Sequence, residues 1–157
     1  FHNPTGQTLA LERRERLVEL SREHGFVIAA DEVYQLLHHG TPPPASFGTL
    51  AERGNVVSLG SFSKILAPGL RLGWIQANPE LMQRMLAQGA LVSGGNFNHF
   101  ASHVVRQLME NGELASFVAH LRTSYAARAE AMKPGTKAAA ISPCRPWLRR
   151  SEPFRRS

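Results

Sequence analysis

The sequence predicts an α/β fold, on three observations. Residues 26–30 and 55–59 are short, nearly continuous apolar runs, which suit strands buried on both faces of a parallel sheet. A segment with helical periodicity precedes the first run, and further helical segments follow a third apolar stretch at 70–77. This order of elements indicates α/β architecture.

The N-terminal segment predicts a turn followed by a helix. Residues 2–6 contain Pro4 and Gly6, which set a turn, and Asn3 is held extended because a proline follows it. A helix is expected over residues 9–24, ended by Gly25. Its expected apolar face consists of Leu9, Leu17, Val18 and Leu20, and the charges expected to face water are Glu12, Arg13, Arg14, Glu15 and Arg16.

The three expected strands carry polar residues that could serve a ligand. The first run delivers Asp31 and Glu32 at its C-terminal end, and the second ends at Gly60 and Ser61. Ligands of open α/β sheets bind at the C-terminal ends of the strands. Arg71 lies in the third, otherwise largely apolar strand, where a buried arginine would need an anion as partner.

Loops and helices complete the predicted fold. The proline-rich stretch 40–47 is expected to be an extended surface loop. Residues 91–98 contain two adjacent glycines and are expected to be a flexible loop; with the helix that follows, they are a candidate dimer interface. The expected helices span residues 79–88, 98–110 and 113–132.

The end of the chain differs from the rest in composition. Periodicity vanishes from Pro134 onward, so residues 133–157 are expected to form a disordered or aberrant tail behind a domain of residues 1–132. The net charge is +6, but five arginines lie within the last 13 residues. The basic balance therefore belongs to the tail, and we expect no nucleic-acid partner.

Composition and motifs argue against several other classes. One cysteine, Cys144, leaves no disulfide framework, and no apolar run is long enough to cross a bilayer. We expect a cytoplasmic protein without membrane contact. His99 and His103 are spaced for a metal on an expected helix, but no third ligand is apparent and we expect no metal site. Ser61-x-x-Lys64 fits the motif of β-lactamases, yet Ser-Asp-Asn and Lys-Thr-Gly do not follow.

The stretch 61–74 combines a lysine amine, two hydroxyls and an arginine. A lysine can attack a carbonyl carbon, and hydroxyls beside an arginine can hold a phosphate. Pyridoxal 5′-phosphate (PLP) carries both groups. Its ring nitrogen needs an ionised acid to stay protonated. The candidates are Lys64 for the carbonyl, Asp31 for the ring nitrogen, Asn3 and Tyr34 for the ring hydroxyl, and Ser61, Ser63 and Arg71 for the phosphate.

Each candidate also has a simpler interpretation. Asp31 at a strand end could cap a helix, Tyr34 could be a packing residue, and Lys64 in a turn could be a solvated charge. Their order and combination favour the functional interpretation.

Four motifs resemble the class I/II aminotransferases, which are PLP-dependent enzymes of fold type I. They are His2-Asn3-Pro4-Thr5-Gly6, Asp31-Glu32-Val33-Tyr34, Ser61-Phe62-Ser63-Lys64 and Pro68-Gly69-Leu70-Arg71-Leu72-Gly73-Trp74. The resemblance covers residues 1–132. It implies an incomplete large PLP-binding domain, with a mainly parallel sheet and flanking helices. The form of the last motif is similar to the aminoadipate, kynurenine and aromatic or branched-chain branch.

The resemblance also implies roles for the candidate residues. Lys64 would form the Schiff base with PLP and then move the proton at the substrate α-carbon, and we expect its amine to be buried and neutral. Asp31 and Tyr34 would be the other catalytic residues, with Asp31 on the ring nitrogen. Asn3 and Tyr34 would bind the ring oxygen. The expected phosphate ligands are Ser61 and Arg71, with Ser63 a weaker third.

The chain departs from the family in length, since full members are more than twice as long. The loop that gives backbone donors to the phosphate, the aromatic residue on the ring, and the small domain with its carboxylate-binding arginine do not appear. We therefore expect a fragment of a homodimeric parent that transaminates an α-amino acid and a 2-oxo acid. The alternatives are a non-catalytic PLP-binding fragment and the ligand-sensing domain of a bacterial transcription regulator, in which a DNA-binding domain precedes this region.

Overall fold

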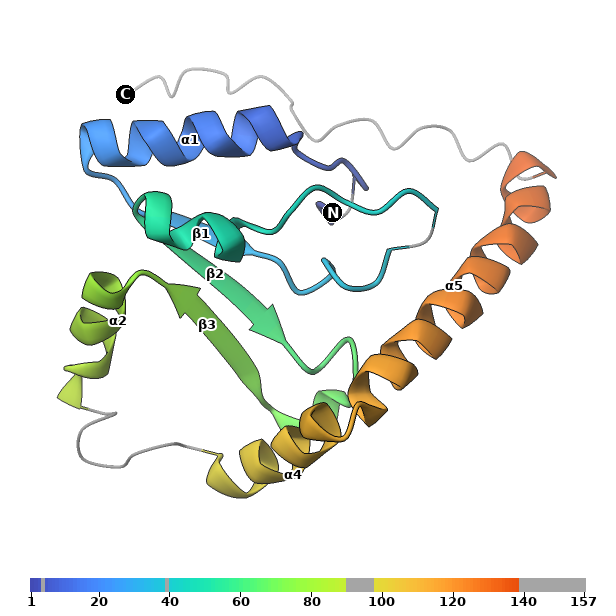
Figure 1. The fold of residues 1–157 in the computed structure, drawn as a ribbon. Helices are drawn as coiled ribbons and strands as arrows, with labels where there is room; N and C mark the ends of the chain where they lie inside the picture. Colours follow the sequence, from blue (N-terminus) through green and yellow to red (C-terminus); the bar gives the residue numbers. More distant parts are fainter. Residues whose placement is uncertain (4, 39, 90–97, 139–157) are drawn as a thin grey trace, which may run out of the picture.

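The computed structural model describes residues 1–3, 5–38, 40–89 and 98–138, and shows a small sheet with helices around it (Figure 1). The elements are α1 (Leu11–His24), β1 (Ile28–Asp31), the 3-10 helix η1 (Phe47–Arg53), β2 (Val56–Ser61), the 3-10 turn η2 (Pro68–Leu70), β3 (Gly73–Ala77), α2 (Pro79–Leu86), α4 (His99–Glu110) and α5 (Glu113–Ala138).

The sheet has the order β1-β2-β3 and mixes two strand directions. β1 runs parallel to β2, so that Asp31 lies opposite Leu59. β3 runs antiparallel to β2, with Gly73 opposite Ser61. The expected α/β class is found, and one of these two strand pairs is antiparallel. The connection over residues 62–72 contains no α-helix, which is the usual crossover between parallel strands.

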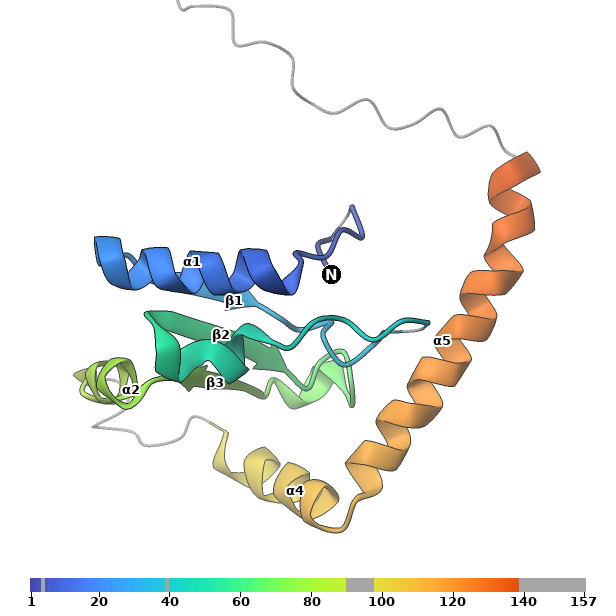
Figure 2. The ribbon, with the colours of Figure 1, turned by 45° about the horizontal axis from the view of Figure 1, so that its top comes forward.

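Helices lie on both sides of this sheet. α1 lies on one side and α4 on the other, and α5 leads away from α4 (Figures 1 and 2). The middle of α5 contacts the loop after β1, where the Nε of Arg122 donates to the carbonyl of Leu36 at 2.7 Å. None of the described helices has the length and apolarity that crossing a membrane requires.

Two apolar clusters lie at opposite ends of β2. The first joins α1, η1 and the start of β2; it consists of Val18, Leu50, Ala51 and Val56, with Ile28 and Phe47 packed against it. The second lies beyond the end of β2 and joins the following turn to α4 and α5; its buried members are Phe62, Ile65, Val105 and Val118. Burial of both groups is what fixes the two ends of β2.

Helix α1 begins and ends near the predicted positions but buries a different face. Gly25 ends it with a φ of 72°, and its N–H donates to the carbonyl of Ser21 at 3.0 Å. The buried face is Arg14, Val18 and Ser21. The expectation that Arg14 faces water is wrong, since only 4% of it is exposed, and Leu17, expected inside, is 37% exposed. A partner for the Arg14 charge, described below, explains the difference.

The strands are shorter and more exposed than expected. Phe26 and Val27 precede β1 and are 41% and 51% exposed, and β1 itself alternates between half-buried and exposed residues. The expectation that β1 is buried on both faces is therefore wrong. The first apolar cluster packs against one face of β1, at Ile28, and the other face is exposed. β3 begins at Gly73, so Arg71 precedes the strand.

The helical predictions are close to the structure. Asn78 caps α2 by accepting a hydrogen bond from the N–H of Leu81 at 2.9 Å. α5 continues to Ala138, beyond the expected end at Met132. The predicted flexible loop lies, apart from Asn98, outside the described residues, as does the predicted tail from residue 139 onward. The boundary between domain and tail stays a prediction.

Candidate functional site

The predicted acid is at the carboxyl edge of the parallel strand pair. Asp31 is the last residue of β1, is exposed, and accepts a hydrogen bond at Oδ1 from the N–H of Val33 at 3.3 Å. The N–H of Glu32 donates to the carbonyl of Leu59 at 3.0 Å, which ties this end of β1 to β2. Tyr34 lies in the turn that follows.

The N-terminal segment closes into a turn beside this edge. The N–H of His2 donates to the carbonyl of Gln7 at 2.8 Å, and the N–H of Gly6 donates to the carbonyl of His2 at 2.7 Å. Gly6 has a φ of 70°, a conformation that a glycine adopts without strain. Asn3 lies exposed within this turn.

A hollow of about 310 Å³ lies between the N-terminal segment and the end of β1. Asp31 and Tyr34 both line it, together with Phe1 and His2 from the N-terminal segment. A second hollow, of about 430 Å³, shares Phe1 and Tyr34 with the first. Asp31 and Tyr34 therefore face the same space, whereas Asn3, Ser61 and Lys64 are not among the residues that line these hollows.

The Lys64 turn is held from beneath by apolar packing. Phe62 and Ile65, on either side of it, are 7% and 2% exposed, while the side chain of Lys64 is exposed. The expectation that this amine is buried is therefore wrong for the described residues, because the turn faces Phe62 and Ile65 inward and Lys64 outward. The Nζ of Lys64 lies 5.9 Å from the ring centroid of Tyr34, within the range of a cation–π contact.

The predicted phosphate ligands lie around the β2–β3 connection. Ser61 accepts a hydrogen bond at Oγ from the N–H of Ser63 at 3.1 Å, and both serines are half-buried. Arg71 precedes Gly73, the β3 residue that pairs with Ser61. The structure thus brings the three predicted ligands to one corner of the sheet.

Arg71 is neither in a strand nor buried, which corrects the sequence prediction. It ends η2 in the left-handed region, with φ 50° and ψ 41°, and is the one non-glycine residue with positive φ among those described. Its Nη1 donates to the carbonyl of Pro68 at 3.3 Å. Such a conformation costs on the order of 1–3 kcal/mol and is held by its surroundings, here by Leu70 and Leu72 packed on the second cluster.

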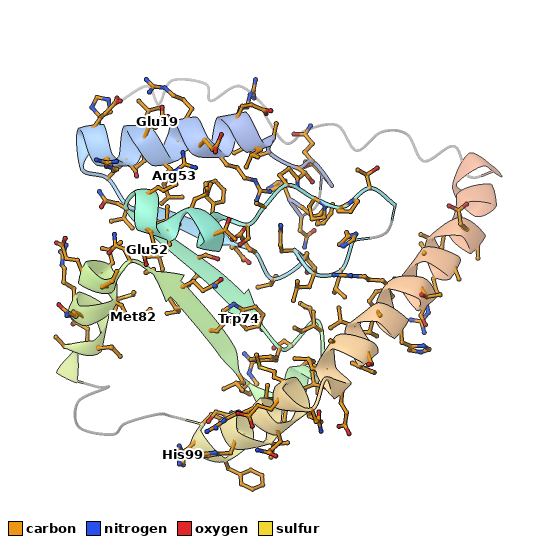
Figure 3. The ribbon with its side chains drawn as sticks, in the orientation of Figure 1. Glu19, Glu52, Arg53, Trp74, Met82 and His99 are labelled. Atoms are coloured by element: carbon orange, nitrogen blue, oxygen red, sulfur yellow. The ribbon has the colours of Figure 1, made fainter. Side chains whose placement is uncertain are left out.

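Trp74, on β3, packs this strand against β2 where the chain leaves the corner. Its ring, labelled in Figure 3, packs against Phe62 with 4.8 Å between the ring centroids. The indole also covers Gly60 so closely that a Cβ there would be 2.0 Å from it. Gly60 is therefore required for close approach of the indole to β2.

Sequence reasoning missed the buried ion pair between Arg14 and Glu32. Their side chains are 5% and 10% exposed, and Arg14 Nη1 lies 3.3 Å from Glu32 Oε1. The signal was present in the helical spacing, since Arg14 shares a face with Val18 and Ser21, four and seven residues on.

The histidine pair weighed as a metal site lies on α4, where Figure 3 labels His99. The Nε2 atoms of His99 and His103 are 3.2 Å apart, and the rings meet edge to face. Across the part of the chain that the structure describes, no group of three or more metal-binding side chains is found.

Together, these features define an α/β domain in which a lysine turn faces a tyrosine beside an acid at the end of a parallel strand. The profile of the family "aminotransferase class I and II" matches residues 1–146, and the chain belongs to this family. The resemblance seen in the sequence is thereby confirmed.

Relatives and solved structures agree with this assignment. The chain is 35% identical over 132 residues to aromatic-amino-acid aminotransferase 1 of Thermococcus litoralis, covering 84% of this chain and 31% of that protein. It is 35% identical over 85 residues to the uncharacterized HTH-type transcriptional regulator YisV of Bacillus subtilis, covering 54% of this chain and 18% of that protein.

The crystal structure of LysN, the α-aminoadipate aminotransferase of Thermus thermophilus, complexed with N-(5′-phosphopyridoxyl)-L-leucine, superimposes with a TM-score of 0.72. The identity is 31%, and the match covers 87% of this chain and 35% of that one. This confirms the predicted fold class. The chain spans about a third of the length of the curated relatives it matches first.

Proposed function

We propose that this chain supplies the lysine side of the site of a PLP-dependent aminotransferase, which exchanges an amino group between an α-amino acid and a 2-oxo acid. The observation that carries the proposal is the approach of Lys64 to Tyr34, at 5.9 Å from amine to ring centroid, beside Asp31 at the end of β1. Family membership supports PLP as the cofactor.

The side chains present fit the groups of PLP. Ser61 accepts a hydrogen bond from the Ser63 backbone, which leaves its hydroxyl proton for a phosphate oxygen. Arg71 donates from Nη1 to a carbonyl, but a guanidinium has five N–H donors and its side chain is exposed. The exposed carboxylate of Asp31 lines the same hollow as Tyr34.

The roles of the side chains follow from these positions. Asp31 would hold the ring nitrogen protonated, and Asn3 and Tyr34 would donate to the ring oxygen. Ser61, Ser63 and Arg71 would hold the phosphate. When bound, PLP supplies an electron sink for the α-carbon of the amino acid. Lys64 would bind the cofactor's carbonyl carbon with loss of water. Once the substrate amine has displaced it, the freed amine of Lys64 would move the proton at the substrate α-carbon.

The substrate class is proposed from the relatives. Two of them are named for aromatic amino acids and for 2-aminoadipate. We propose amino acids with large or acidic side chains as the first panel to test, with a 2-oxo acid as the amino acceptor. A cytoplasmic location and a homodimeric parent remain predictions.

Covalent trapping tests the proposal. The chain has three lysines, Lys64, Lys133 and Lys137. After incubation with PLP and reduction with borohydride, peptide mapping should find the pyridoxyl group on Lys64. The Lys64→Ala variant should lose the label, and the matched Lys133→Ala variant should keep it. Equal labelling of all three lysines would contradict the proposal.

The second candidate function is ligand sensing, which the match to the regulator YisV favours. Both candidates predict PLP on Lys64, so trapping does not separate them. Single-turnover conversion of bound PLP by an added amino acid separates them, because a sensor needs binding alone. Specific labelling with no conversion by any amino acid in the panel would favour a non-catalytic role, which is either the sensor or a PLP-binding fragment.

A further inference from the structure

Among the described residues, the carboxylate of Glu32 is a largely buried group that the proposed chemistry does not use. It follows Asp31 directly, yet the environments of the two neighbours are opposite. Asp31 is exposed and accepts at 3.3 Å from one backbone N–H, whereas the Glu32 side chain is 10% exposed. A buried carboxylate is retained only where donors compensate its lost hydration.

Glu32 accepts from donors on three separate elements. Ser58 on β2 donates its hydroxyl to Oε2 at 2.7 Å, and Arg14 on α1 lies 3.3 Å from Oε1. The backbone N–H groups of Phe47 and Gly48, at the start of η1, donate at 3.0 and 3.4 Å. One side chain therefore fixes the end of β1 against β2, α1 and η1.

Arg14 extends this set of bonds to two loops. Its Nε donates to the carbonyl of Leu9 at 3.0 Å, and its Nη1 donates to the carbonyl of Ala45 at 2.8 Å. Its guanidinium carbon also lies 5.3 Å from the centroid of the Phe47 ring. Leu9 ends the N-terminal segment that carries Asn3, and Leu9, Arg14 and Glu32 line the same hollow as Asp31 and Tyr34.

We propose that Glu32 and Arg14 form a positioning clamp, which sets the end of β1, with Asp31 and Tyr34, against the N-terminal segment, with Asn3. Neither residue of the clamp is assigned a contact with PLP in the proposed function. This inference rests on the proposed function, because its consequence is the correct placement of the groups that would hold the ring of PLP.

The geometry of arginine is part of the clamp. A lysine at position 14 would keep the positive charge beside Glu32, but one ammonium group on a flexible stem lacks the fork that reaches Leu9, Ala45 and Glu32 together. The Arg14→Lys substitution therefore keeps the positive charge but removes the hydrogen bonds that join Leu9, Ala45 and Glu32. If neutralising the Glu32 charge were enough, the Arg14→Lys variant would keep the PLP affinity and the amide exchange of the wild type.

The test compares PLP binding of the folded chain with three variants: Glu32→Gln, Arg14→Lys and Val56→Ala. Val56 is fully buried in the first cluster and makes none of the clamp's hydrogen bonds, so its truncation lowers stability without removing any of them. We expect PLP affinity to fall on the order of tenfold in Glu32→Gln and Arg14→Lys, by analogy with residues that orient metal ligands. It should be unchanged in Val56→Ala.

Hydrogen exchange gives a readout that does not need the cofactor. In Glu32→Gln, exchange at the amides of Phe47 and Gly48 should accelerate, and in Arg14→Lys it should accelerate at His2 and Gly6. Val56→Ala should not reproduce this local pattern. Unchanged exchange at these amides in both clamp variants would overturn the inference, whether or not the chain binds PLP.

The proposed function and the clamp can fail separately. A wild-type chain without specific PLP binding would contradict the function and leave the exchange measurement to decide on the clamp. A wild-type chain that binds PLP through Lys64, with Arg14→Lys and Glu32→Gln binding equally well, would overturn the clamp alone.

Discussion

The two corners of the sheet that carry the candidate residues are stabilised in different ways. The Glu32 corner comprises the start of α1, the end of β1 and residues 45–48, and it buries charged groups that bond to each other and to the backbone. The Lys64 corner comprises residues 61–74 with α4 and α5. It buries apolar side chains and leaves Lys64 and Arg71 exposed.

This difference shows what each corner tolerates. Removing one partner of a buried ion pair strongly destabilises the fold, because the remaining charge is left buried without compensation. Truncating a buried apolar side chain lowers the free energy of unfolding in proportion to the volume of the cavity it leaves. The first corner should therefore be sensitive to polarity and the second to size, and three substitutions test this contrast.

Removing the Glu32 carboxylate should have the largest effect on stability. Glu32→Ala leaves the Arg14 guanidinium, the Ser58 hydroxyl and two backbone N–H groups without their acceptor. We expect the free energy of unfolding to fall by about 3–5 kcal/mol, measured by urea denaturation.

The double variant Glu32→Ala, Arg14→Leu is the control, because it removes the uncompensated cation as well. It should recover part of the lost stability. A single variant that loses less than about 1 kcal/mol would mean that the pair behaves as an exposed one and that the contrast between corners is wrong.

Truncating Ile65 should cost somewhat less and acts at the Lys64 corner. Ile65 is 2% exposed beneath the lysine turn, and Ile65→Ala should lower the free energy of unfolding by about 2–4 kcal/mol. Ile75, which is 46% exposed on β3, is the matched control, and its change to alanine should cost much less. Equal losses at the two isoleucines, in the same urea measurement, would show that the second cluster is not a packed core.

The same contrast explains which features can be predicted from sequence. The position of Asp31 is predictable because a short apolar run followed by an acid is a local signal of a strand end. The Lys64 turn is equally local. Its apolar support is not, since Val105 and Val118 reach Ile65 only through the tertiary fold.

The failures have two physical causes. One is a partner distant in sequence, and the other is a backbone state that the residue type does not reveal. Arg14 stands in a run of charges that predicts a solvated face, but its partner Glu32 lies eighteen residues on. Arg71 stands among apolar residues that predict a strand. It adopts a positive φ, which non-glycine residues rarely do, so its sequence gives no reason to expect it.

The smallest effect is expected for the exposed pair that also joins α1 to η1. Arg53 is labelled in Figure 3 on η1. Its Nη1 lies 2.9 Å from Glu15 Oε1, closer than the two atoms of the Arg14–Glu32 pair, but the side chains are 55% and 36% exposed. Arg53→Gln should cost less than about 1 kcal/mol, because water and salt screen the charges. A double-mutant cycle with Glu15→Gln measures the coupling, which should shrink further at high salt. If this coupling equalled that of Arg14 and Glu32, then distance, and not burial, would decide the strength of ion pairs in this domain, and the sensitivity expected of the Glu32 corner would not come from its burial.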